Sequence, residues 1–500
     1  MFDRFLPRPE GFIPNSPGFH SGLARGHGPP RTPSAAVRSF TGDHTLARRL
    51  GWVTDPGPVA TSPDDVAPPA GLRGARGQML AISLAVLGTL PAVLTRIAGA
   101  SPQEYLAPVL FGFAILSASF LLAWAAEALQ LDISQGLALT VLALIAVLPE
   151  YAVDFTFAWK AGKNPVEYAP LALANMTGSN RLLIGVGWAM VVLVAAWRMK
   201  SIAKKRGYEG EIDTDTVLDR PHAIEIAFLA IATLYSLTLP LKRTLTLFDG
   251  VILIAIFVVF FWRIGKSPSE EPHLVGPARL IGALPTQRRR VAVGVMLGYA
   301  ALVIFLCAAP FAESLVHVGE KAGISTFLLV QWVAPLASEA PELLVAGLFA
   351  WRLNTSAGLG TLLSSKVNQW TLLVGSLPLV FAISSGTLHG LPIDSLQREE
   401  LFLTAAQSVF ACAVLVNRRL SVNEAWALFG LFISQFILGG VLPDGARELE
   451  RIIVGCTYLA LAAGMLVVNG RFVRPLFHDG LREPVGELFR EDEPEEASSL

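Results

Sequence analysis

Charge and cysteine are scarce in this 500-residue sequence. Asp, Glu, Lys and Arg make up 16% of it, against about 25% in ordinary soluble proteins. The three cysteines, Cys307, Cys412 and Cys456, lie in apolar segments without paired spacing, which argues against a disulfide framework and a zinc cluster. The net charge of −1 gives no information about a nucleic-acid partner, and none is expected. A nucleophile–base set, a phosphate-binding loop and an HExxH motif are also missing, so the sequence argues against an enzyme.

Apolar residues are abundant instead, at 53% of the chain, and the mean hydropathy is +0.52. Runs of about 18 residues or more, each long enough to cross a bilayer, recur along most of the sequence. The sequence therefore predicts an all-α polytopic membrane protein with about 12 transmembrane helices. The predicted spans are 79–98, 105–130, 135–159, 170–197, 222–241, 247–264, 291–317, 324–351, 357–384, 401–417, 423–442 and 452–470.

The segments outside these spans have a different composition. Residues 1–75 are rich in Pro, Gly and Arg without a long apolar run, which predicts a disordered tail rather than a signal peptide. Residues 482–500 are acidic and predict a second solvated tail. Residues 265–290 predict a loop between the two halves of the chain.

Basic residues in the loops predict the orientation. The stretch RMKSIAKKR at 198–206, the arginines at 288–290 and Arg418–Arg419 all fall on the side of the Arg-bearing N-terminal tail. The positive-inside rule therefore predicts that both termini and the loop 265–290 are cytoplasmic, in a protein of the cell (inner) membrane.

Two apolar stretches, Val141–Trp159 and Val330–Trp351, share a pattern. Each contains Pro-Glu, at 149–150 and at 341–342, and each reaches Phe-Ala-Trp at the same interval downstream. Further matches are Ala126–Glu127 with Ala312–Glu313, Ile133–Ser134 with Ile324–Ser325, and Ala174–Asn180 with Gly360–Lys366.

The matched Pro-Glu helices are the third and eighth predicted spans, so they cross the membrane in opposite directions. This predicts two inverted-topology repeats of about five helices each, an arrangement that places the substrate site of secondary transporters near the midplane. Pro149 and Pro341 predict helix interruptions there, because each proline removes a backbone donor and frees a carbonyl one turn earlier. The repeats are predicted at 105–264 and 291–442, with the extra spans 79–98 and 452–470 outside them.

Acidic residues in the middle of apolar spans are costly, and in membranes they mark functional sites by default. Glu150 and Asp154 share one helix face, and Ser338, Glu339 and Glu342 share another. Hard cations such as Ca²⁺ and Na⁺ prefer oxygen ligands, and His or Cys clusters that favour softer metals are missing. The candidate cation ligands are Glu150, Glu342, Asn175, Asp154, Ser338, Glu339, Asn180 and Thr361, with Glu150 and Glu342 as the main ones.

Two basic residues complicate this site. Lys366 occupies the position matched to Asn180, and Arg181 follows Asn180 directly. Each is a candidate charge partner of a carboxylate or a contributor to proton coupling, and Asp154 and Glu339 are either ligands or partners of these cations. An inward-pointing Lys366 would neutralise a carboxylate without a metal, which favours proton coupling.

At these residues the chain resembles the cation/Ca²⁺ exchanger superfamily, in its sodium/calcium exchanger membrane region, over residues 105–442. That family has two inverted repeats, each with a Gly-Thr-Ser-x-Pro-Glu-like helix followed by a Gly-Asn-x-x-Gly-Ser-Asn-like helix. The resemblance implies Glu150 and Glu342 as central cation ligands, supported by Asn175. The chain departs from the pattern at Ala146, Val147, Glu339, Thr361 and Lys366.

The resulting expectation is an antiporter that binds Ca²⁺ or Na⁺ between the two Pro-Glu helices. It would exchange this cation for H⁺ or Na⁺ by alternating access, with small inorganic cations and the lipid bilayer as its partners and without a cofactor. The alternative is a transport-inactive membrane sensor or assembly protein in which Lys366 occupies the cation site. In a further alternative, Glu150 and Glu342 are structural acids that are permanently protonated or salt-bridged.

Overall fold

The computed structural model describes residues 75–132, 147–208, 210, 212–267, 274, 276–323 and 325–489. The predictions for residues 1–74, for the first part of the span 135–159 and for 490–500 fall outside the described residues, as do the matches at Ile133–Ser134 and Ile324. The chain divides into two units, Met1–Arg76 and Gly77–Leu500. The second unit, which contains almost all of the described residues, is helical.

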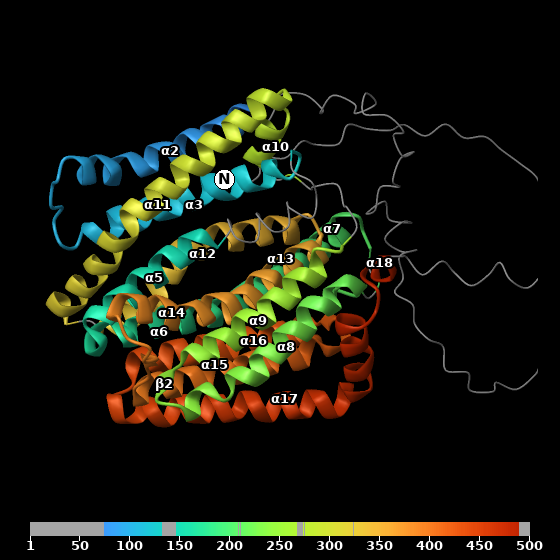
Figure 1. The fold of residues 1–500 in the computed structure, drawn as a ribbon. Coiled ribbons are helices and arrows are strands. Elements are labelled where there is room, and N and C mark those ends of the chain that lie inside the picture. The colour runs from blue at the N-terminus through green and yellow to red at the C-terminus, as the bar shows by residue number, and fades with distance from the viewer. Residues whose placement is uncertain are drawn as a thin grey trace, which may run out of the picture. The chain divides into compact units, whose positions relative to one another are not determined.

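The first half of the helical unit is a series of helices (Figure 1). Its helices are α2 (Ala75–Ile97), α3 (Ala107–Leu129), α5 (Leu148–Lys163), α6 (Pro165–Leu182), the π-helix η3 (Leu183–Trp188), α7 (Ala189–Lys205), the short η4 (Arg220–His222), α8 (Ala223–Ser236), the short η5 (Leu239–Leu241) and α9 (Leu247–Ile264).

The second half has the same organisation with additional helices at its end (Figure 1). Its helices are α10 (Pro277–Gly282), α11 (Thr286–Ala322), α12 (Thr326–Trp351), α13 (Thr355–Asn368), the π-helix η6 (Gln369–Leu373), α14 (Val374–Ser385), α15 (Ser395–Val414), the short η7 (Leu415–Asn417), α16 (Val422–Val441), α17 (Asp444–Leu481) and α18 (Val485–Leu488).

Within the described residues, 11 helices are long and apolar enough to cross a membrane. The remaining predicted span, 135–159, overlaps α5, which extends to Lys163. The prediction of an all-α, multi-pass membrane protein is thus confirmed, and for 247–264 even the bounds agree. The windows of α2 and α17 are only 17% buried, against 83% for α15, so the two extra spans lie at the edge of the helical unit.

The two halves repeat their elements in order. In each half a helix continues through a π-helical segment into the next helix, as α6–η3–α7 and as α13–η6–α14. The last helix of each repeat, α9 or α16, begins with a capping box, in which Thr246 pairs with Asp249 and Ser421 with Glu424.

Four two-residue strands are also related by the repeat of the two halves. Strand β1 (Thr216–Val217) pairs antiparallel with β4 (Arg419–Leu420), and β2 (Thr244–Leu245) pairs antiparallel with β3 (Leu391–Pro392). Because β1 and β3 precede the fourth helix of their repeats and β2 and β4 precede the fifth, exchanging the repeats converts one strand pair into the other. The strand pairs therefore join the two repeats.

Prolines were predicted to interrupt both Pro-Glu helices, and the structure differs from this prediction. Pro149 lies in the first turn of α5, where a proline is readily accommodated, and α12 runs without a break through Pro335 and Pro341, so the prediction is wrong for α12. The carbonyl that Pro335 leaves without its helical donor is that of Gln331. It is packed against Gly178 of α6, so this freed polar group is buried in protein.

The region predicted as the loop 265–290 is partly helical, since it contains α10 and the start of α11. Arg289 lies in the first turns of α11 and donates to both oxygens of Asp132, just beyond the end of α3, at 2.7 and 3.0 Å. These bonds lower the pKa of Asp132 below its usual value. The ion pair fixes the start of the second half against the end of α3.

Candidate functional site

Two buried glutamates from different repeats share the same polar partners. The Ser179 hydroxyl on α6 is in hydrogen-bond contact with Glu150 Oε1, at 2.5 Å, and with Glu339 Oε1. The Gln369 side-chain amide of η6 donates to Glu150 Oε2 at 3.0 Å and to Glu339 Oε1 at 3.1 Å. Glu150 and Glu339 are only 3% and 2% exposed, so a carboxylate of α5 and one of α12 meet inside the helical unit.

The second Pro-Glu motif repeats the arrangement of the first. Ser365 on α13 occupies the position matched to Ser179, and its hydroxyl donates to Glu342 Oε2 at 2.6 Å. The pairs Ser179–Glu150 and Ser365–Glu342 are therefore equivalent contacts of the two repeats. Glu342 is only partly buried, so its surroundings are more open than those of Glu150.

Asp154 lies one turn after Glu150 on α5 and is completely buried. Asn175 of α6, also completely buried, donates from Nδ2 to Asp154 Oδ1 at 2.9 Å. The structure thus brings together two more residues that the sequence singled out.

Several buried oxygens of this group have no hydrogen-bond partner within the described part of the chain. They are Asp154 Oδ2, Asn175 Oδ1, Glu339 Oε2 and Gln369 Oε1. A buried polar atom without a partner is destabilising by about 1–3 kcal/mol, so such atoms are rare unless they serve a ligand. Carboxylate and amide oxygens fit a hard cation, whereas imidazole and thiolate ligands are absent from this described group.

Lys366 is completely buried, but its contacts are not with a carboxylate. Its ammonium donates to the backbone oxygen of Asn180 at 3.0 Å and to Asn180 Oδ1 at 2.6 Å. The ammonium also lies 4.8 Å from the centre of the Trp370 ring, within range of a cation–π interaction.

Arg181, the other predicted charge partner, pairs outside this group of carboxylates. Its Nη2 lies 2.7 Å from Glu400 Oε2 on α15, and both side chains are almost fully buried. It also donates to Gln435 Oε1 at 3.2 Å and lies over the Trp332 ring at 5.0 Å. This contact set is that of a structural ion pair.

Within the described part of the chain, three predicted ligands make no hydrogen bond to a carboxylate. Asn180 accepts from Lys366 at Oδ1 and donates from Nδ2 to the Met176 carbonyl of its own helix at 2.8 Å. Thr361 is exposed, and its hydroxyl donates to the Ala357 carbonyl of its own helix at 2.9 Å. The buried Ser338 hydroxyl bonds to the Ala334 and Pro335 carbonyls at 3.3 and 3.2 Å, which satisfies backbone oxygens in the proline-containing part of α12.

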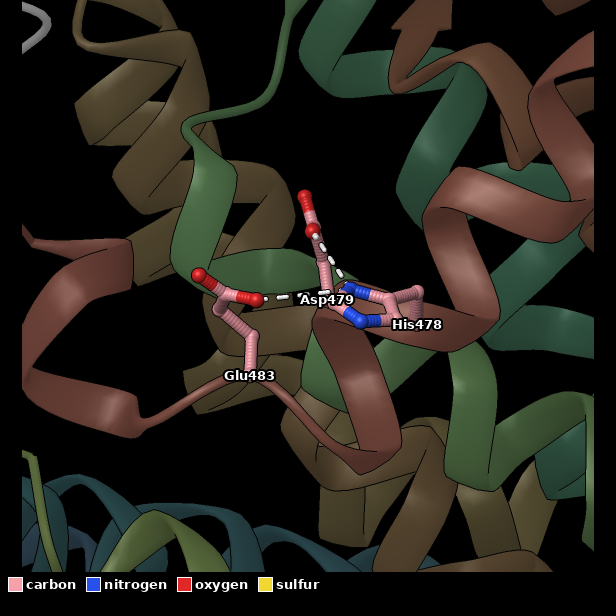
Figure 2. A group of neighbouring side chains, drawn as sticks. All are labelled: His478, Asp479 and Glu483. Atoms are coloured by element: carbon pink, nitrogen blue, oxygen red, sulfur yellow. Dashed lines mark ion pairs between the residues drawn. The ribbon is translucent and has the colours of Figure 1, made fainter.

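A separate group near the end of α17 has the residue types of a metal site. Figure 2 shows His478, Asp479 and Glu483 gathered there, with ligand atoms within 4.8 Å of one another. Arg220 donates to Asp479 Oδ2 at 3.0 Å and lies 3.8 Å from Glu483 Oε1, so both carboxylates already pair with a guanidinium. The group ties α17 to the start of α8, and we assign it no ion.

The sequence analysis missed several residues of this polar interior. Ser179, Ser365 and Gln369 contact the carboxylates, and Glu225 and Glu400 are acids buried in α8 and α15. Glu225 and Glu400 could have been identified from the sequence as candidate membrane acids, because each adjoins a long apolar run.

Comparison with known proteins identifies the family. A sequence model described as sodium/calcium exchanger protein matches residues 105–265 and 292–438. No curated protein sequence matches the chain.

Solved structures agree with this match. The crystal structure of the H⁺/Ca²⁺ exchanger CAX is 39% identical, covers 80% of this chain and 97% of its own, and superimposes with a TM-score of 0.74. The structure of native YfkE is 14% identical, covers 73% of this chain and 100% of its own, and has a TM-score of 0.54, which reflects the fold alone. The chain therefore belongs to the sodium/calcium exchanger protein family, as its motifs predicted, and is a membrane cation antiporter rather than an enzyme.

Proposed function

We propose that the chain exchanges Ca²⁺ for H⁺, with both ions using the carboxylates of Glu150, Glu339 and Glu342. The observation that carries this proposal is the Ser179 hydroxyl shared by Glu150 and Glu339. A hydroxyl has one proton to donate, so the contact with two carboxylates is satisfied best when one of them carries a proton of its own. Where a cation enters, the same oxygens become ligands and the proton leaves.

The oxygen inventory supports a divalent cation. Asp154 and Asn175 add buried oxygens beside the glutamates, and Ca²⁺ takes six to eight oxygen ligands with flexible geometry. Buried carboxylates are unstable as a group of bare anions, so a site of this kind holds either cations or protons. The similarity to a protein described as an H⁺/Ca²⁺ exchanger favours Ca²⁺ and H⁺, rather than Na⁺, as the exchanged ions.

Alternating access follows from the repeats. Inverted repeats allow one bundle to rock against the other around a central site, which opens the site to one side of the membrane at a time. The positive-inside rule and an even number of predicted spans support cytoplasmic termini in a cell (inner) membrane.

The alternative of a transport-inactive protein requires Lys366 in the cation's position. Its ammonium instead donates to Asn180, and the unpartnered oxygens of Glu339 and Gln369 remain open to a ligand. These contacts favour the antiporter.

The test is Ca²⁺ uptake into proteoliposomes driven by an imposed pH gradient. We expect uptake by the wild type and none by a double Glu150→Gln, Glu342→Gln variant, with Glu313→Gln, an exposed acid paired with Lys160, as the matched control. Full activity in the double variant, or uptake that ignores the pH gradient, would refute the proposal.

A further inference from the structure

Glu225 and Glu400 occupy equivalent positions in the two repeats. Glu225 follows Val217, the last residue of β1, at the same interval as Glu400 follows Pro392, the last residue of β3. The two glutamates are only 5% and 2% exposed, and neither belongs to the carboxylate site described above. Each contacts the opposite repeat, since Glu225 bonds to α13 and Glu400 to α6.

Glu400 is neutralised by its partners. Arg181 Nη2 lies 2.7 Å from Oε2, Gln331 donates to the same oxygen at 2.9 Å, and Arg451 Nη1 lies 3.8 Å from Oε1. A cavity of about 220 Å³ adjoins it between α12, α15, α16 and α17, and its lining includes Arg447 as well as Arg451. Arg451 also pairs with Glu399 at 2.7 Å, and the buried Glu450 lies near Glu400, Arg181 and Arg451. Glu400 is therefore held in a network of ion pairs, which disfavours its use as a cation ligand.

Among the described residues, no guanidinium or ammonium group pairs with Glu225. Its Oε1 accepts a hydrogen bond from the Ser364 hydroxyl at 3.3 Å and lies 3.5 Å from His222 Nδ1. Its Oε2 is buried and has no hydrogen-bond partner among the described residues. A carboxylate oxygen in this condition is open to a cation, and the Ser364 hydroxyl provides a second oxygen beside it.

A line of polar side chains connects Glu225 to the carboxylate site. Thr361, Ser364, Ser365 and Asn368 are spaced so that they share one face of α13. Ser365 donates to Glu342 at 2.6 Å, and Ser364, its neighbour in sequence, donates to Glu225. Exposure decreases along this face from the exposed Thr361 through the partly buried Ser364 to the buried Ser365.

We propose that Glu225 is an entry site for the transported divalent cation on the side of the membrane where α8 and α13 begin, here called the α8 side. The cation passes from Glu225 and Ser364 to Glu342, and the Arg181 ion pair keeps the equivalent Glu400 from acting in this way. The two access routes of the exchanger therefore differ in how their equivalent acid is paired, although the repeats that form them are related by symmetry. This inference rests on the proposed Ca²⁺/H⁺ exchange.

The experiment compares Ca²⁺ transport from each side of the membrane. Proteoliposomes sorted by orientation are supplied with Ca²⁺ on the α8 side or on the opposite side, and the initial rate is measured against Ca²⁺ concentration. For Glu225→Gln we expect a KM raised about three- to tenfold on the α8 side, with an unchanged maximal rate and an unchanged KM on the other side. Glu225→Asp should recover most of the affinity.

Two further variants make the result specific. Asp213→Asn removes the same charge from an exposed position in the connection that leads to α8, and it should leave the KM unchanged on both sides. Ser364→Ala keeps Glu225 and should raise the KM on the α8 side by a smaller factor, which tests the site even if Glu225→Gln does not fold. An unchanged KM, or an equal rise on both sides, overturns the entry site. A wild type that exchanges no Ca²⁺ for H⁺ overturns the proposed function itself, so the two failures are distinguishable.

Discussion

Lys366 and Asn180, which occupy matched positions in the two repeats, contact each other at 2.6 Å. Residues at equivalent positions meet only close to the axis that relates the repeats, so this axis passes between α6 and α13 at these two side chains. Ser179 and Ser365, which contact the carboxylates, are the residues directly before Asn180 and Lys366 in these two helices. The repeats are thus symmetric in their backbone and asymmetric in charge, because a lysine replaces the second asparagine.

Replacing Lys366 with asparagine should strengthen cation binding. The variant removes a buried positive charge close to the carboxylates and keeps a polar side chain next to Asn180. We expect a KM for Ca²⁺ lower by roughly three- to tenfold, which corresponds to about 0.7–1.4 kcal/mol of relieved repulsion.

The control for this prediction is Lys366→Met, which also removes the charge but leaves the Asn180 oxygens without their donor. It should lower the stability of the protein by about 1–3 kcal/mol in a thermal unfolding measurement. A KM that stays the same in Lys366→Asn would contradict the electrostatic argument.

Ser179 and Ser365 form a natural comparison because they are matched positions. Ser179 contacts Glu150 and Glu339, whereas Ser365 has one carboxylate partner, Glu342. Ser179→Ala should therefore lower Ca²⁺/H⁺ exchange about tenfold or more, and Ser365→Ala should lower it less, since a hydrogen bond to a charged group contributes about 1.5–3 kcal/mol. Uptake rates in proteoliposomes at equal protein content measure this difference. Equal losses in the two variants would argue against a shared proton at Ser179.

The Arg181–Glu400 ion pair should be important for stability. Arg181→Met leaves the Glu400 carboxylate buried without its guanidinium, and such a loss is destabilising by about 3–5 kcal/mol. The double variant Arg181→Met, Glu400→Met should recover most of this stability, because apolar side chains of similar volume replace both charges.

Arg419→Met serves as the control, since its partner Asp213 and Arg419 itself are largely exposed. Its effect on thermal unfolding should be about 0–1 kcal/mol. A double variant less stable than Arg181→Met alone would show that the pair has a role beyond charge compensation.

The sequence predicted the spans well because apolar length is a direct requirement of the bilayer. The span 247–264 was predicted from its apolar length with the observed bounds, and in the structure the capping box of Thr246 and Asp249 starts the helix there. A boundary error of six residues hid Glu400, because the span was predicted to begin at 401 while α15 begins at Ser395. The acid was therefore assigned to a loop although it is buried in the helix.

The partners of the carboxylates were harder to foresee. Ser179 and Gln369 are ordinary residues in sequence, and only the crossing of α6, α12 and η6 brings both to Glu339. The predictions that Lys366 neutralises a carboxylate or occupies the cation site depended on the direction in which its side chain leaves α13. The direction of the Lys366 side chain is fixed by its contact with Asn180, a residue of the other repeat.

Gly178 is the point of closest approach between α6 and α12. A Cβ at this position would lie 1.8 Å from the backbone oxygen of Gln331, the carbonyl freed by Pro335. The added methyl group would meet backbone atoms, which cannot move aside as a flexible side chain can. Gly178→Ala must therefore push α6 away from α12. Overpacking of this kind costs about 1–3 kcal/mol and sometimes more, and the same displacement would separate Ser179 from Glu339.

We therefore expect Gly178→Ala to lower both the unfolding temperature and the rate of Ca²⁺/H⁺ exchange. Gly430→Ala is the matched control, because Gly430 lies within α16 and a Cβ there meets nothing within 4 Å. That substitution should leave transport unchanged and stabilise the helix by up to about 1 kcal/mol. If Gly178→Ala retained wild-type exchange, the contact between Ser179 and Glu339 would not depend on the close packing of α6 on α12, and the shared-proton mechanism would lose its structural basis.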